Sequence, residues 1–274
     1  MPGEFTERDI AFLLEVADRR LLTSLDIIKD DRTFVDSLLE TQATEIVRRL
    51  MLMSQDAIVS SITPRFLFEA LLRAARKELS ARAYTTERDA LQRIPVFDTR
   101  DVLRFLRDDA IIKYLAQMLT SFTRIRSFTW PVRIRKGVWR RVRFNDMDID
   151  SLMRYSETVD KAQRFPYYQR IGDLCLFILG IFPEYAGGRA YPGHGIPAIP
   201  VFGRHRRSAE DYEREGRHFY RIASEHEEAL TQGIGGILRK LDDNFHLAEK
   251  PLNLISERYL DFNKGRLFPA IPGE

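Results

Sequence analysis

The sequence predicts a mainly all-α protein, an irregular multi-helix assembly of about eight to ten helices with one inserted basic β-hairpin. Apolar residues recur three and four positions apart behind capping residues over most of the chain. One short stretch instead alternates apolar with basic residues. With 44% hydrophobic residues among 274, the chain can bury a full core without disulfides or metal ions.

A series of helices is predicted for the first half of the chain. A capping pattern begins a helix over residues 6–20, and one long helix or two in series are expected over residues 33–62. A proline at the first helical position begins the next helix, over residues 64–80. Residues 81–97 form a connector, and a second capping pattern begins a further helical segment over residues 98–122.

The β-hairpin is predicted within residues 123–145. Apolar and basic residues alternate there on either side of Lys136 and Gly137, where a tight turn favours glycine. The alternating apolar positions are Val132, Ile134, Val142 and Phe144. We therefore expect an N-terminal helical half over residues 1–122, the hairpin, and a C-terminal helical half over residues 146–274, packed as one compact unit.

The second half is predicted to begin with a helix that runs to residue 164 and ends before Pro166. Residues 171–182 are apolar nearly all round, which favours a central buried helix, although a buried strand fits the pattern too. Residues 183–207 contain five glycines and four prolines. Such a long segment without periodic structure indicates a functional loop or disorder.

Three more helices are expected after this loop. Ser208 begins a helix that should run to Gly233, and a short helix follows it. The inner face of the first carries Tyr212, Gly216, Phe219, Ala223, His226 and Leu230. Pro251 at the start and Gly265 just past the end frame the last helix.

Composition narrows the class of protein. Lysine and arginine outnumber acidic residues by only 43 to 40. The chain as a whole is therefore not strongly basic, and a site for an anionic partner would require a local concentration of basic residues. The single cysteine, Cys175, lies in an apolar run, which indicates a buried thiol in a reducing compartment. The longest apolar stretch, residues 174–182, is far shorter than the roughly 20 residues that span a bilayer, and the first residues do not resemble a signal peptide. We therefore expect a soluble, cytoplasmic protein.

The hairpin is the first candidate for a functional site. Residues 123–144 hold eight arginines and lysines, no acidic residue and both tryptophans of the chain. Basic charge interleaved with aromatic rings is typical of nucleic-acid surfaces. The candidate residues are Arg133, Arg135, Lys136, Trp139, Arg141 and Arg143. As alternatives, these charges protect a strand edge, pair with the three aspartates at 146, 148 and 150, or bind an acidic protein surface or a second copy.

The second candidate is a metal site. Two short motifs resemble half of the ligand set of di-iron helical bundles, and they consist of Glu215, His218, Asp243 and His246. The inward-facing Glu215 and His226 are more simply explained as a buried ion pair and a hydrogen-bonded core histidine. We expect no cofactor. The favoured hypothesis is a non-catalytic binding or assembly protein, and the alternative is a helical enzyme with a pocket under residues 183–207, for which a metal ion is one option.

Overall fold

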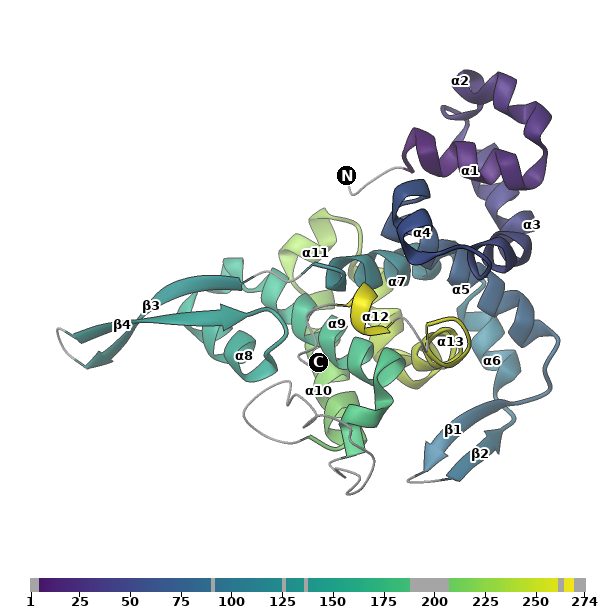
Figure 1. Cartoon of the computed structure of the whole chain (residues 1–274). Helices are drawn as coiled ribbons and strands as arrows, with labels where there is room; N and C mark the ends of the chain where they lie inside the picture. Colours follow the sequence, from purple (N-terminus) through teal and green to yellow (C-terminus); the bar gives the residue numbers. More distant parts are fainter. Residues whose placement is uncertain are drawn as a thin grey trace. The chain divides into compact units, whose positions relative to one another are not determined.

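The computed structural model describes residues 5–89, 92–124, 127–135, 138–187, 207–260 and 264–268. It is mainly helical with an inserted β-hairpin, as the sequence predicts, and Figure 1 shows the order of its elements. The chain divides into two compact units: unit 1 comprises residues 1–121 and 257–260, and unit 2 comprises residues 122–256 and 261–274. Within the described residues, no helix combines the length and the apolar character that crossing a membrane requires.

Unit 1 is built around two long helices, α3 and α5, that pack against each other (Figure 1). Its elements are α1 (Glu7–Ala17), η1 (Arg19–Ser24), α2 (Leu25–Ile28), α3 (Arg32–Leu50), α4 (Gln55–Ser61), α5 (Pro64–Ser80), β1 (Thr85–Asp89), β2 (Gln92–Val96), α6 (Thr99–Phe105) and α7 (Asp109–Phe122). The region over residues 33–62 therefore forms two helices in series. The helix that begins at Pro64 is confirmed.

Asp9 explains why the first helix begins where the sequence predicts. Its carboxylate accepts hydrogen bonds from the backbone and hydroxyl of Thr6, both at 2.8 Å, which completes a capping box at the start of α1. The same carboxylate accepts from the Thr63 backbone at 2.6 Å and from the Thr63 hydroxyl at 3.0 Å. Asp9 is fully buried, so one carboxylate fixes the beginnings of both α1 and α5.

The connector expected over residues 81–97 is a second antiparallel hairpin, formed by β1 and β2. Its sequence lacks the apolar alternation that signals a half-buried strand, which is why the sequence predicts no hairpin there. Thr85, at the start of β1, donates a hydrogen bond to the Asp98 side chain. Since that carboxylate is engaged, Asp98 does not cap α6 through its side chain, although α6 begins at the expected place.

Unit 2 consists of the inserted hairpin followed by helices packed around α9. Its elements are β3 (Ser127–Arg135), β4 (Val138–Asn145), α8 (Ile149–Thr158), η2 (Lys161–Gln163), α9 (Phe165–Ile181), η3 (Pro183–Gly187), α10 (Ala209–Ser224), α11 (Glu227–Thr231), α12 (Gly235–Asp243), α13 (Phe245–Arg258) and α14 (Lys264–Leu267). The helix α10 packs along α9, and α12 packs along α10 (Figure 1).

The central buried helix is confirmed. Every residue from 171 to 182 is buried, and all but the last belong to α9. Glycines allow α10 to approach α9 closely: a Cβ added at Gly172 would lie 2.7 Å from the Tyr220 ring, and one added at Gly216 would lie 2.9 Å from Cβ of Cys175. Cys175 itself is fully buried, in agreement with the prediction.

Three helix boundaries in unit 2 differ from the prediction. The helix α8 ends at Thr158, and the chain turns through η2 before α9 begins at Phe165. The helix α10 ends at Ser224 and not at Gly233, so Leu230 is 68% exposed instead of facing the core. Pro251 lies inside α13, which begins earlier because buried Phe245 anchors its first turn beside Tyr220 of α10, with ring centroids 6.0 Å apart.

Candidate functional site

The basic hairpin of unit 2 is an antiparallel ladder of β3 and β4 that extends away from the helices, with α8 at its base (Figure 1). The candidate turn residue Lys136 and its neighbour Gly137 lie outside the described residues. The Cα partners include Phe128 with Phe144, Thr129 with Arg143, Trp130 with Val142, Pro131 with Arg141, Val132 with Arg140, and Arg133 with Trp139. Residues directly opposite each other occupy the same face of an antiparallel pair.

This register assigns the basic positions to faces. Arg133, Trp139, Arg141 and Arg143 occupy one face of the ladder together with Thr129 and Pro131, and we call this the basic face. The register shifts between Arg133 and Arg135, which brings Arg135 opposite Val138. Strict alternation along the strand would place Arg135 on the same face as Arg133. The bulge moves its position to the opposite face, because one extra residue reverses the alternation.

Arg170 of α9 contacts both segments that join the hairpin to the helices of unit 2. We call these segments, residues 122–124 and 146–150, the stems of the hairpin. The guanidinium of Arg170 lies 3.7 Å from the ring centroid of Phe122, which precedes β3, and it donates to the Asp146 carboxylate, which follows β4, at 2.8 Å. Phe122 is 1% exposed and stacks on Phe177 in the middle of α9, with centroids 4.1 Å apart. Both stems are therefore anchored to the buried helix of unit 2 by a charge-assisted hydrogen bond and ring contacts.

The three aspartates after β4 all interact with the helical part of unit 2. Asp146 pairs with Arg170, and Asp148 caps α8 by accepting from the backbone of Asp150 and Ser151 at 3.1 and 3.3 Å. Asp150 pairs with the buried Arg207 at 2.6 Å. The alternative that the hairpin arginines also pair with these aspartates stays a prediction.

Arg207 also accounts for one of the inward-facing groups that the sequence singles out. Its Nε donates to the Glu215 carboxylate at 2.7 Å, so Arg207 joins α8 to α10. The expected ion pair of Glu215 is thus present, but the Glu215 side chain is 25% exposed and only Arg207 is buried. The other group, His226, caps α11: its Nδ1 accepts from the Glu228 backbone at 3.2 Å, and its Nε2 lies 3.0 Å from the Lys161 carbonyl oxygen. Both side chains have structural partners.

The alternative metal ligands are not brought together as a set. Glu215 is held by Arg207, while His218, Asp243 and His246 are exposed on α10, α12 and α13. Among the residues that the structure describes, no three His, Cys, Asp or Glu side chains form a group that could hold a metal ion. Of the loop predicted over residues 183–207, residues 188–206 lie outside the described residues, and the pocket hypothesis for that region stays a prediction.

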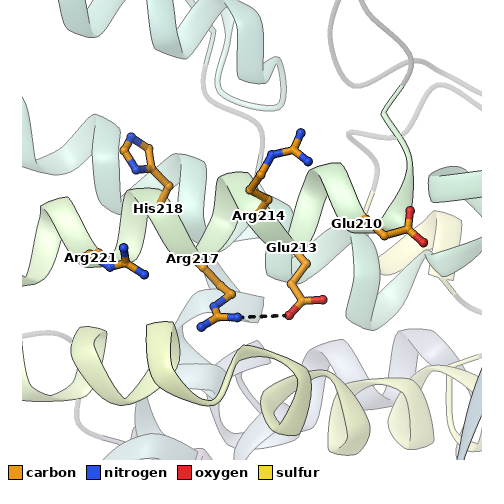
Figure 2. A pocket seen from close by; sticks show the side chains of 6 residues that line it. All are labelled: Glu210, Glu213, Arg214, Arg217, His218 and Arg221. Carbon is orange, nitrogen blue, oxygen red and sulfur yellow. Dashed lines mark ion pairs between the residues drawn. The ribbon is translucent and has the colours of Figure 1, made fainter.

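A pocket of about 430 Å³ runs along α10 (Figure 2). It is lined by Glu210, Glu213, Arg214, Arg217, His218 and Arg221. Each guanidinium is already paired: Arg214 with Asp211, Arg217 with Glu213, and Arg221 with the buried Asp242 through hydrogen bonds of 2.9 and 3.2 Å. This balance of charge favours a solvated helix face over an anion-binding site.

Unit 1 contains a buried charge network centred on Arg73. Its fully buried guanidinium lies 3.1 Å from Glu69 of α5, 3.4 Å from Glu40 of α3 and 3.6 Å from Asp109 of α7. Burial raises the pKa of the Glu69 carboxyl, against the opposing effect of the nearby Arg73 charge. The network joins three helices of unit 1, and we interpret it as structural.

The residues whose side chains connect distant elements of unit 2 were not predicted from the sequence. Arg170 and Asp242 belong to helices whose apolar pattern is visible, but their partners are distant in sequence, and no local spacing signals them. A basic residue directly before the long apolar run is the only hint to Arg170.

Comparisons of the chain with protein-family models, with curated proteins and with solved structures find no match.

Proposed function

We propose that the protein binds nucleic acid through the hairpin formed by β3 and β4. The observation that carries the proposal is the charge of this element: residues 123–144 hold eight basic residues and both tryptophans without one acidic residue. In a chain whose total charges nearly balance, this concentration is local. A polyanion would relieve the mutual repulsion of these cations and release its own counterions.

The base of the hairpin supports this proposal. Arg170 holds both stems against α9, and Asp146, Asp148 and Asp150 interact with groups of the helical part of unit 2. A binding element that is fixed at its base loses less conformational freedom when it engages a ligand. The helical unit thus acts as a scaffold that presents the basic ladder.

Binding to labelled DNA and RNA, measured by fluorescence anisotropy over a series of salt concentrations, tests this proposal. We expect dissociation constants of about 1 to 100 µM near physiological salt, and an affinity that falls steeply as salt increases. The variant in which Arg133, Arg141 and Arg143 are replaced by Ser should lose at least about tenfold in affinity and show a smaller salt slope. Its melting temperature should hardly change.

The matched control replaces Arg19, Arg48 and Arg104 by Ser. These arginines are 65–75% exposed in unit 1, and each pairs with a single acidic neighbour. Both triple variants remove the same net charge, so a general electrostatic effect would weaken them equally. Failure of the parent protein to bind either nucleic acid at low salt would overturn the proposal. If the hairpin substitutions instead convert an oligomer to monomers, the hairpin is an assembly element.

A further inference from the structure

We infer that the ligand of the hairpin is double-stranded DNA, entered through its major groove. This inference rests on the proposed function and specifies its substrate class. It follows from the backbone of the ladder and from the way the register sorts residue types onto its two faces. Three forms of nucleic acid can be compared with these properties: duplex DNA, duplex RNA and single strands.

The size of the ladder fits duplex DNA. The strands β3 and β4 contain nine and eight residues. At about 3.3 Å per residue, the ladder is roughly 26 to 30 Å long. The major groove of B-form DNA is about 12 Å wide and accepts a two-stranded β-ribbon. The major groove of duplex RNA is deep and narrow, and side chains cannot read its bases.

The basic face carries the residue types that read base edges. Arg133, Arg141 and Arg143 share it with Thr129, and the terminal pair of Ser127 and Asn145 continues the same alternation; Pro131 and Trp139 are the two positions of this face that offer no such contact. Arginine pairs with guanine and asparagine with adenine in the major groove, while serine and threonine bond to either. A row of such positions on one face is suited to following the floor of that groove.

The same register argues against single strands. Proteins that bind single strands combine cations and aromatic rings along one surface, so that bases stack while phosphates are neutralised. In this ladder Phe128, Trp130 and Phe144 occupy the face opposite to Arg133, Arg141 and Arg143, and among the aromatic residues only Trp139 shares the basic face. The two arginines on the aromatic face, Arg135 and Arg140, lie nearer the turn than the three rings. Bases stacked on the aromatic positions would leave the three cations of the basic face on the wrong side.

The test compares a DNA duplex, an RNA duplex and single-stranded DNA of matched length and sequence at one salt concentration. We expect the DNA duplex to bind at least about tenfold more tightly than the other two. A DNA duplex with bulky substituents at the thymine C5 positions, which fill the major groove, should bind more weakly than the unmodified duplex. Equal or tighter binding of single strands or duplex RNA would overturn this inference but leave the proposed function intact, whereas no binding to any probe would overturn both.

A pair of variants tests which face contacts the DNA. Replacing Arg141 and Arg143 by Ser removes two charges from the basic face, and replacing Arg135 and Arg140 by Ser removes two from the opposite face. We expect the first variant to lose more affinity for the DNA duplex and to lose any preference between sequences, while the second loses less affinity and keeps that preference. The reverse order would overturn the assignment of the basic face. Circular dichroism and the melting temperature establish that both variants are folded.

Discussion

Arg73 places a permanent charge where unit 1 has no solvent, and it is compensated by carboxylates of three helices. Buried ion pairs of this kind contribute little net stability, because desolvation offsets the attraction between the charges. Removing only one partner of such a pair is strongly destabilising, because the remaining charge then lies buried without its partner. The buried pair of Arg73 and Glu69 as a whole should therefore matter less for total stability than for which packing of α3, α5 and α7 is allowed.

Substitution of Arg73 by Ala is expected to destabilise the protein by about 3 to 5 kcal/mol, because Glu69 loses its main counter-charge. Replacing both residues, Arg73 by Met and Glu69 by Leu, should restore most of this loss. Urea unfolding of the single and double variants measures both effects, and Arg19→Ala, which removes an exposed ion pair, serves as the control. A double variant as unstable as Arg73→Ala would contradict this account.

Cys175 is buried in the middle of α9, and burial raises the pKa of its thiol well above the ordinary value. The protonated thiol is a poor nucleophile, and its surroundings exclude reagents. A thiol-specific reagent should thus leave the native protein unlabelled and modify one thiol per chain in denaturant. Rapid labelling of the native protein at neutral pH would show that this part of α9 opens readily.

At the level of elements, the sequence predicts a helix well where its signals are local. The capping box of Thr6 and Asp9 and the proline at the start of α5 mark helix beginnings that the structure confirms. The predictions fail where distant contacts decide. The break after Ser224 depends on His226 binding the Lys161 carbonyl and capping α11, and the start of α13 depends on Phe245 packing beside α10.

The packing of α10 requires a glycine at position 216, because this residue lies directly against side chains of neighbouring helices. A Cβ at this position would lie 2.5 Å from the Phe245 ring, so Gly216→Ala should push the helices apart and destabilise the protein by about 1 to 3 kcal/mol. Gly236 in α12 is the matched control, since an added Cβ meets nothing within 4 Å. Gly236→Ala should stabilise the protein by up to about 1 kcal/mol. Thermal unfolding of the two variants should show shifts of opposite sign.

For the molecule as a whole, the sequence identifies the element proposed to bind but not how it is held. The charge of the hairpin is visible in the amino-acid order. The bulge that moves Arg135 to the opposite face depends on how the strands pair, and Arg170 reaches Asp146 from 24 residues away. Local patterns therefore suggest the candidate site, whereas its geometry results from contacts that no local spacing encodes.

The proposed function makes a prediction about this coupling between scaffold and hairpin. Arg170→Met removes the hydrogen bond to Asp146 and the cation over Phe122, while its apolar side chain still fills the space. We expect the stems to loosen, with faster amide hydrogen exchange at residues 122–124 and 146–150 and unchanged exchange in α1 and α3. DNA affinity should fall several-fold, although Arg170 belongs to the stem and not to the basic face. Asp146→Asn, which keeps the guanidinium over Phe122, should have a smaller effect of the same sign. Parental exchange rates and DNA affinity in Arg170→Met would mean that the hairpin does not depend on this contact, and that its position is set by the chain around it.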